Sequence, residues 1–257
     1  MHPMLNVAIS AIRKAGDILL HNYENINLEN HDNIVNSIVL KKIINNVKNV
    51  IINVLNKFYP THLFVNKNNF NKIDIKKGVL WVVNELNGKN NFVKKFPHFA
   101  ISIAILVKGE TKISVIYDPM KNELFTAVKG RGAQINGYRM RCSNNKKLSN
   151  NHIVFNNKIF TDLQIKNYFQ IINKLCINKN KIKVTGSTLL NLSYIASGRI
   201  DICIHFSISK LILVTSELQV KESGGFINYL SSTNEFFNKH KNIIAGNSKI
   251  INYFLNK

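Results

Sequence analysis

Residues 99–128 read FAISIAILVKGETKISVIYDPMKNELFTAV and contain three strand-like runs, at 100–107, 112–117 and 123–128. Short turns, KGET and DPMKN, separate these runs, which are rich in the β-branched and apolar residues of buried strands. Two further strand-like runs precede them, at 62–65 and 79–83. The middle of the chain is therefore predicted to form a sheet whose strands are joined by short connections.

Toward the N-terminus the apolar residues recur at the spacing of an α-helix. One predicted helix covers residues 4–22, with Gly16 as a mild defect, and its apolar stripe consists of Leu5, Ile9, Ile12, Ala15, Ile18 and Leu19. A second covers residues 38–58 and ends before Pro60. Its buried face is expected to consist of Val39, Ile43, Val47, Val50, Ile51 and Val54.

Beyond residue 150, strand and helix patterns alternate. Strands are expected at 153–155, 181–184, 200–206, 225–229 and 242–245, and helices at 162–175, 187–197 and 216–223. No repeat and no Gly/Ser-rich or Pro-rich linker divides the chain, so residues 1–257 are expected to form a single domain. This order of elements favours an α/β (α+β) fold of layered helices and sheets over a Rossmann fold or a barrel.

Composition excludes several classes of protein. No apolar run reaches the roughly 18 residues of a membrane-spanning helix, so a membrane protein is not expected. The start of the chain lacks the pattern of a secretory signal peptide, and three scattered cysteines cannot build a disulfide framework. We therefore expect a cytoplasmic protein.

The net charge of +21 would ordinarily suggest a polyanionic partner. The chain contains 40 Asn, 36 Ile and 30 Lys but only five Arg, a composition typical of A/T-rich codons. Arginine is the preferred residue for bidentate binding of phosphate, so its scarcity argues against a nucleic-acid surface. Direct binding of nucleic acid is an open alternative but not the favoured one.

Six ordered blocks that span almost the entire chain resemble bacterial members of the inositol monophosphatase family. These blocks are MHPMLN at 1–6, WVVNELNGKNNF at 81–92, FPHFAISIA at 96–104, YDPMKNELFTAVKGRGAQINGYRMR at 117–141, TGSTLLNLSYIASGRID at 185–201 and ELQVKESGG at 217–225. The resemblance implies an αβαβα sandwich, a homodimer, and hydrolysis of inositol monophosphates with Mg²⁺. Members of one bacterial branch also act with the transcription factor NusA on RNA polymerase and support antitermination and synthesis of ribosomal RNA. The resemblance therefore implies NusA and RNA polymerase as partners.

The acidic positions that hold Mg²⁺ in the family are largely substituted here. The family motif DPLDGTTNF reads NELNGKNNF, so Asn84 and Asn87 replace two ligand aspartates, and Asn90 replaces the threonine that orients water. Only the backbone carbonyl of Leu86 remains as a ligand in this motif. Four further acidic positions of the family are also substituted, and they read Ile44, Lys67, Asn68 and Ile212. Ile212 follows Leu211, which stands where the family has Trp.

The carboxylates of the chain support the same interpretation without the family. The sequence has 14 Asp and Glu residues, and their spacing shows no clustered site for a hard metal ion. A Lys67 ammonium about 4 Å from a divalent ion would cost about 8 kcal/mol at an effective dielectric constant of about 20. No cofactor is therefore expected, and Mg²⁺ would be needed only if the ancestral activity survives.

Several other positions have both a functional and a structural interpretation. The resemblance implies that Gly88, Lys183 and His205 lie at the substrate pocket, with Lys and His replacing Arg and Glu. His205 alternates with Cys203 on one strand, where core packing is favoured over a metal site. The loop GRGAQINGY at 130–138 is interpreted as a turn, since it lacks the spacing of a phosphate-binding loop. TGS at 185–187 is interpreted as an ordinary helix cap.

Three classes of function follow. The favoured hypothesis is a pseudoenzyme that keeps a binding role with NusA and RNA polymerase, because core blocks are intact while metal positions are substituted together. The alternative is residual Mg²⁺-dependent hydrolysis of inositol monophosphate, with Glu85 contributing to a rescued metal site. The third class is a non-specific RNA or DNA binder that uses the positive charge.

Overall fold

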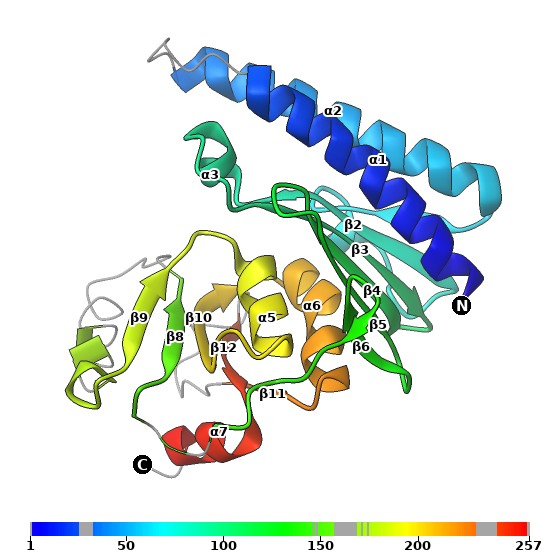
Figure 1. Ribbon diagram of the computed structural model, residues 1–257. Coiled ribbons are helices and arrows are strands. Elements are labelled where there is room, and N and C mark those ends of the chain that lie inside the picture. The colour runs from blue at the N-terminus through cyan, green and yellow to red at the C-terminus, as the bar shows by residue number, and fades with distance from the viewer. Residues whose placement is uncertain are drawn as a thin grey trace.

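The computed structural model describes residues 2–25, 33–145, 147, 149–156, 169–170, 172–173, 175–229 and 241–255. Its elements stack in five layers, which are two N-terminal helices, a seven-stranded sheet, two central helices, a five-stranded sheet and a C-terminal helix (Figure 1). This arrangement confirms the αβαβα architecture expected from the sequence. No helix within the described ranges is long and apolar enough to cross a membrane.

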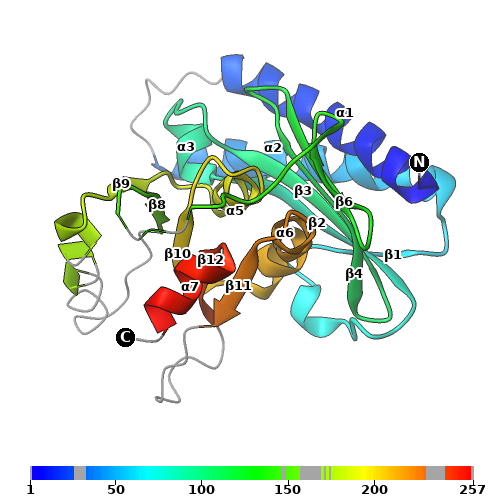
Figure 2. The same ribbon diagram turned by 60° about the horizontal axis from the view of Figure 1, so that its bottom comes forward.

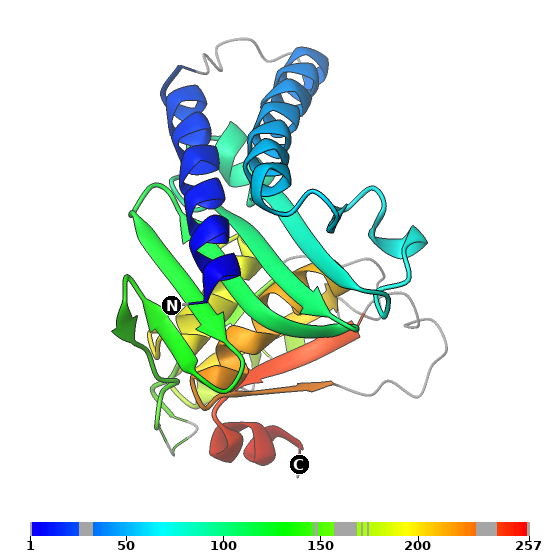
Figure 3. The same cartoon turned by 90° about the vertical axis from the view of Figure 1, so that its right-hand side faces the viewer.

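The first layer consists of α1 (Pro3–Asn25) and α2 (Asn33–Phe58), which lie side by side over one face of the larger sheet (Figure 3). Their buried faces contact β2, β3 and β4 in one hydrophobic cluster. The face predicted for α2 was wrong at Val39, which is 42% exposed, and it omitted Leu55, which is fully buried. Val39 lies one to two turns before Ile43 and Val47, where α2 reaches the core.

The larger sheet contains seven strands in chain order. They are β1 (Leu63–Val65), β2 (Val79–Asn87), β3 (Ala100–Val107), β4 (Glu110–Asp118), β5 (Glu123–Val128), β6 (Gly132–Ile135) and β7 (Tyr138–Arg139). Only β1 and β2 pair in parallel. The bounds of β3 and β5 are those predicted, whereas β2 extends to Asn87 through an irregularity in its pairing with β3. The 3-10 turn Phe70–Lys72 and α3 (Lys89–Val93) were not predicted.

The central layer consists of α5 (Thr188–Ala196) and α6 (Lys210–Glu222), which lie between the two sheets (Figure 2). The helix predicted at 216–223 begins earlier, at Lys210. Its first turn, LILV at 211–214, is continuously apolar and resembles a strand in the sequence. The side chain of Ser209 accepts a hydrogen bond from the backbone N–H of Ile212 and fixes the start of the helix.

The smaller sheet has the strand order β11-β12-β10-β8-β9. Its strands are β8 (His152–Phe155), β9 (Lys181–Val184), β10 (Ile202–Ile208), β11 (Phe226–Tyr229) and β12 (Lys241–Gly246). The last helix, α7 (Ser248–Leu255), packs on its outer face through Ile250 and Ile251 and was not predicted. Most of the helix predicted at 162–175 lies outside the described residues.

Hydrophobic contacts bring three distant segments to one place. Leu211, at the start of α6, packs in a cluster with Val65 at the end of β1 and Val82 in β2. Leu189, at the start of α5, belongs to the neighbouring cluster between the sheets. The C-terminal ends of β1 and β2 therefore lie near the N-terminal ends of the central helices, and the substituted positions Lys67, Asn84, Asn87 and Ile212 are on or next to these segments.

Candidate functional site

A buried polar pair lies where the family has its acidic motif. The side-chain amide of Asn66 donates a hydrogen bond to the Glu85 carboxylate at 2.8 Å. Both residues are buried, with 9% and 7% of their surface exposed. Glu85 is thus held by an amide donor from the turn after β1, and this contact fixes that turn against β2.

Two lysines accompany this carboxylate. Lys67 is exposed and directly follows Asn66. Burial and then the positive charge of Lys67 lower the pKa of Lys89, while Glu85 acts in the opposite direction. Two ammonium groups therefore share the surroundings of one carboxylate, so the local charge is positive where the family concentrates negative charge.

Asn87 has its side chain at the N-terminus of α5. Its Oδ1 accepts hydrogen bonds from the hydroxyl of Ser187 at 2.9 Å and from the backbone N–H of Leu189 at 3.1 Å. Ser187 occupies the N-cap position, but its own side chain makes no capping hydrogen bond. The sequence interpretation of TGS as an ordinary cap is corrected, because the capping oxygen comes from Asn87, in β2.

The other positions of the motif have separate surroundings. Asn84 is half-buried and pairs with Ser102 across β2 and β3, and the Leu86 side chain is buried in the core beneath α1 and α2. Asn90 is exposed in α3, where its backbone carbonyl accepts the N–H of Lys94. Ile44 is half-buried against the same core as Leu86, and Asn68 is exposed beside Lys67.

Gly88 joins β2 to α3 with a positive φ of 88°. A Cβ atom at this position would lie 2.8 Å from the backbone oxygen of His98 and 3.1 Å from Cα of Phe99. Close approach of two backbone segments therefore requires glycine here, whether or not a substrate binds.

The remaining predicted substrate positions are not both near Asn87. His205 is buried in β10, and its Nε2 lies within hydrogen-bond distance, 2.8 Å, of Thr188 Oγ1 at the start of α5. Lys183 is exposed on β9, at the edge of the smaller sheet, with its Nζ 3.4 Å from His152 Nδ1. The structure thus places His205 beside the helix that Asn87 caps, and it places Lys183 toward a sheet edge.

Ile212 and Cys203 have the surroundings of core residues. The half-buried Ile212 side chain packs against the cluster between the sheets, which contains the buried Cys203. Burial raises the pKa of the Cys203 thiol to about 12, so this cysteine remains protonated near neutral pH. Neither side chain is a suitable metal ligand in this state.

The residues present do not fit the Mg²⁺ that the family uses. Within the described ranges, no group of three or more His, Cys, Asp and Glu side chains could hold a metal ion. Glu85 is a single carboxylate with two lysines nearby, and Mg²⁺ depends on oxygen ligands that include carboxylates. The described residues of this site therefore lack the ligand set of a metal-assisted hydrolysis.

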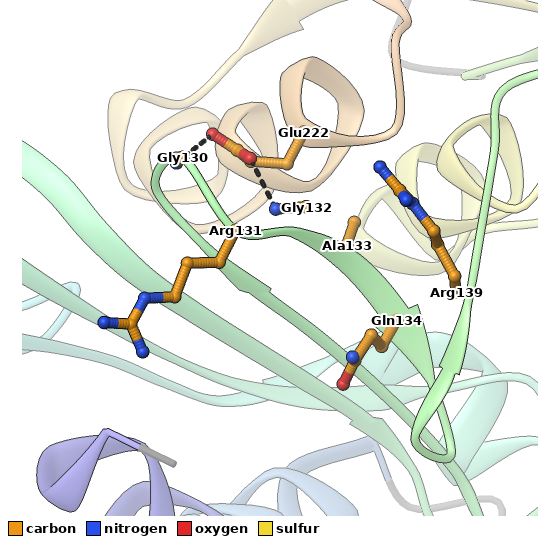
Figure 4. Close-up of a pocket in the computed structure, with 7 residues that line it drawn as sticks. All are labelled: Gly130, Arg131, Gly132, Ala133, Gln134, Arg139 and Glu222. Carbon is orange, nitrogen blue, oxygen red and sulfur yellow. Dashed lines mark hydrogen bonds between the residues drawn. The ribbon is translucent and has the colours of Figure 1, made fainter.

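A cavity of about 410 Å³ lies elsewhere, at the β5–β6 turn (Figure 4). The two carboxylate oxygens of Glu222, at the end of α6, accept the backbone N–H groups of Gly130 and Gly132, each at 2.8 Å. Of the segment interpreted as a turn, residues 130–131 and 136–137 form turns, whereas 132–135 form β6 and Tyr138 begins β7. The N–H groups of Gly130 and Gly132 already bind an anionic side chain of the protein itself. No sequence pattern indicates this pairing, because Glu222 is 90 residues from Gly132.

Comparison with known proteins identifies the family. The model of the inositol monophosphatase family matches residues 1–257. The Nus factor SuhB of Buchnera aphidicola subsp. Schizaphis graminum is 43% identical over 247 residues, which are 96% of this chain and 91% of that relative. The Nus factor SuhB of Escherichia coli is 34% identical over 255 residues, which are 99% of this chain and 95% of that relative.

A solved structure gives the same result for the fold. The crystal structure of extragenic suppressor protein suhB from Bartonella henselae superimposes with a TM-score of 0.79 at 28% identity and covers 97% of this chain and 96% of that chain. The match of fold and sequence extends over nearly the full length, including the segments that carry the substituted positions. This chain therefore belongs to the inositol monophosphatase family.

Proposed function

We propose that this protein is a pseudoenzyme of the inositol monophosphatase family and that its function is binding. In this proposal it works with NusA and RNA polymerase in antitermination during synthesis of ribosomal RNA. It acts as a homodimer, as the family resemblance implies, and in the cytoplasm, as the sequence pattern predicts. The relatives named Nus factor SuhB support the transcriptional role.

The main support for a loss of activity is that the Asn87 side chain caps helix α5. In the family an aspartate at this position is a metal ligand, whereas here the Oδ1 atom accepts hydrogen bonds from Ser187 and Leu189. In this chain the position has a structural role that does not need a metal ion. Lys67 and Lys89 add positive charge around Glu85, which opposes binding of a divalent cation.

Phosphate release from inositol monophosphate, with and without Mg²⁺, tests the loss of activity. The natural protein is expected to be inert in both conditions. A variant that carries Lys67→Glu, Asn84→Asp, Asn87→Asp and Ile212→Asp is the matched comparison, provided that its circular dichroism spectrum shows a folded chain. Turnover by the natural protein that EDTA abolishes would instead support the Mg²⁺-dependent phosphatase, with Glu85 as a metal ligand.

Association with NusA tests the binding role separately. Purified protein is expected to bind its cognate NusA in a direct assay such as surface plasmon resonance, with no dependence on added Mg²⁺. The absence of association with both NusA and RNA polymerase would overturn this part of the proposal. Because phosphatase activity and NusA binding are measured independently, the failure of one does not decide the other.

A further inference from the structure

The arginines of this chain are concentrated in one short segment. Only five arginines occur among 257 residues, against 30 lysines, and three of them, Arg131, Arg139 and Arg141, lie within 11 residues. Codon bias toward lysine accounts for the charge of the chain as a whole. It does not account for three guanidinium groups in one hairpin, where a lysine would supply the same charge.

The other two arginines have partners inside the protein. Arg199 donates a hydrogen bond from Nη1 to Glu123 Oε2 at 2.8 Å, and its Nη2 forms an ion pair with Oε1 at 2.8 Å. Arg13 donates to Asn122 Oδ1 at 3.1 Å, and its guanidinium lies 5.4 Å from the centre of the Tyr117 ring. Arginine at these two positions is explained by the fold itself.

The three hairpin arginines differ in this respect. Arg131, Arg139 and Arg141 are all exposed, and none of them forms an ion pair with a carboxylate in the described part of the chain. The nearby lysines do have such partners, since Lys129 pairs with Glu110 and Lys221 pairs with Glu217. The arginines are therefore the cations of this region that remain available to a ligand.

Figure 4 shows the placement of two of these side chains around the cavity at the β5–β6 turn. Arg131 and Arg139 both line it, and Arg139 Nε lies 3.9 Å from where a Cβ atom on Gly132 would be. Glu222 already occupies the backbone N–H groups of Gly130 and Gly132. The side chains of Arg131, Arg139 and Gln134, and not the glycine loop, are thus the donors around this cavity, with Arg131 and Arg139 extending on opposite sides of it (Figure 4).

An exposed aromatic side chain accompanies the arginines. Tyr138 is 80% exposed in β7, which is the edge strand of the seven-stranded sheet. Arg139 follows it, and Gln134 pairs with Arg139 across β6 and β7. Guanidinium groups bind phosphates and an exposed ring can stack a base, so this hairpin carries both kinds of group.

We propose that the hairpin at residues 130–141 binds the phosphodiester backbone of a single-stranded nucleic acid, with a base stacked on Tyr138. The net charge of +21 favours a polyanion over a neutral partner, and the guanidinium fork matches phosphate oxygens. Arginine and tyrosine are also common in contacts with proteins, so an acidic protein segment is the competing partner. The proposal does not depend on the loss of phosphatase activity, because it uses none of the residues around Asn87.

Fluorescence anisotropy with labelled oligonucleotides of about 12 nucleotides tests the proposal, with RNA and DNA of the same sequence as separate arms. The main variant carries Arg131→Gln, Arg139→Gln and Arg141→Gln. The matched control carries Lys41→Gln, Lys42→Gln and Lys57→Gln on exposed positions of α2, which removes the same charge. A third variant changes the three arginines to lysine, and Tyr138→Ala is compared with Tyr138→Phe.

The arginine-to-glutamine variant is expected to lose at least about tenfold in affinity and to reduce the salt slope by about two, since each phosphate contact with a single strand contributes about 0.7. The lysine control should change affinity by less than about twofold, because α2 lies outside the contact. The arginine-to-lysine and Tyr138→Ala variants should be weaker than the natural protein, whereas Tyr138→Phe should keep its affinity. The RNA and DNA arms show which nucleic acid is preferred.

Three results would overturn the proposal. Equal losses in the two glutamine variants would mean diffuse electrostatic binding without a site. No detectable binding to either oligonucleotide at low salt would exclude the ligand class. Tighter binding of a polyglutamate peptide, with the same dependence on the three arginines, would assign the hairpin to an acidic protein partner.

Discussion

The Asn87 side-chain oxygen accepts a hydrogen bond from the Ser187 hydroxyl at 2.9 Å, across 100 residues of sequence. The same oxygen accepts the N–H of Leu189, so one side chain from β2 anchors the first turn of α5. A position that serves metal binding in the family therefore holds two layers of this structure together. This contact accounts for an acceptor side chain at position 87 without any reaction.

Asn87→Ala is expected to lower the free energy of unfolding by about 1–2 kcal/mol. The substitution removes the acceptor of two donors, and the N–H of Leu189 belongs to a fully buried residue. Urea unfolding monitored by Trp81, the single tryptophan of the chain, measures the change. Asn87→Asp is the control, since its carboxylate keeps the acceptor at a helix N-terminus, and it should remain within about 0.5 kcal/mol. Equal losses in both variants would contradict the capping role.

Much of the fold could be predicted from the sequence because its signals are local. The strands at 100–107 and 123–128 have the bounds that the sequence predicts, because the KGET turn ends the first and the DPMKN turn precedes the second. The apolar start of α6, at 211–214, does not belong to the helix that the sequence predicts. Its helical state depends on the Ser209 cap and on packing between two sheets. Val39 was wrongly placed in the core, because its apolar character does not show where α2 leaves the sheet.

The candidate site could be predicted only in part. The lack of acidic ligands at positions 67, 84, 87 and 212 can be read from the sequence once the family is identified. The present partners of Asn87 and Glu222 could not be read from it, because each contact joins segments at least 90 residues apart. Hydrogen bonds of this kind depend on the tertiary arrangement and leave no periodic pattern.

Gly16 has a role that its helix propensity does not indicate. A Cβ atom on Gly16 would lie 2.5 Å from Cε1 and 2.9 Å from Cδ1 of Tyr117. The Tyr117 ring is held by its hydroxyl, which donates to Asn122 Oδ1 at 3.1 Å, and by Arg13 over its face. The glycine interpreted as a mild defect therefore permits α1 to approach β4.

Gly16→Ala is consequently expected to lower the free energy of unfolding by about 1–3 kcal/mol, although alanine is the better helix former by about 1 kcal/mol. Ser10→Ala, at an exposed position of α1, is the matched control and should change it by less than about 0.5 kcal/mol. Chemical denaturation of both variants measures the difference. A Gly16→Ala variant more stable than the natural protein would show that the contact with Tyr117 relaxes freely.

Glu222→Ala is expected to open the β5–β6 turn without unfolding the protein. The carboxylate is the acceptor for the Gly130 and Gly132 N–H groups, and hydrogen bonds to a charged group contribute about 1.5–3 kcal/mol. Hydrogen exchange at these two amides should accelerate by about tenfold or more, whereas amides of β3 should keep their rates. Glu24→Ala, on the exposed face of α1, should leave all these rates unchanged. Unchanged exchange rates in Glu222→Ala would show that the turn is stable without the Glu222 carboxylate.

His98 is expected to make the stability of the protein depend on pH below neutrality. The residue is 8% exposed, and burial, followed by the positive charge of Lys121, lowers the pKa of His98 from 6.5 to about 4. Its Nε2 atom has no hydrogen-bond partner in the described part of the structure. The imidazole is therefore neutral in the folded protein at pH values where it is already protonated in the unfolded chain.

Below about pH 6.5 the unfolded state binds a proton at His98 that the folded state does not bind. The contribution of the neutral His98 to the free energy of unfolding is therefore fully present above about pH 6.5 and is lost as the pH falls toward about 4. The loss should approach about 3 kcal/mol, at 1.36 kcal/mol for each pKa unit. Urea unfolding at several pH values between about 4 and 7 measures it. His98→Leu should remove most of this slope, since leucine has no proton to exchange, whereas the exposed His21→Gln should leave it intact. A His98→Leu variant with the slope of the natural protein would assign the pH dependence to other groups.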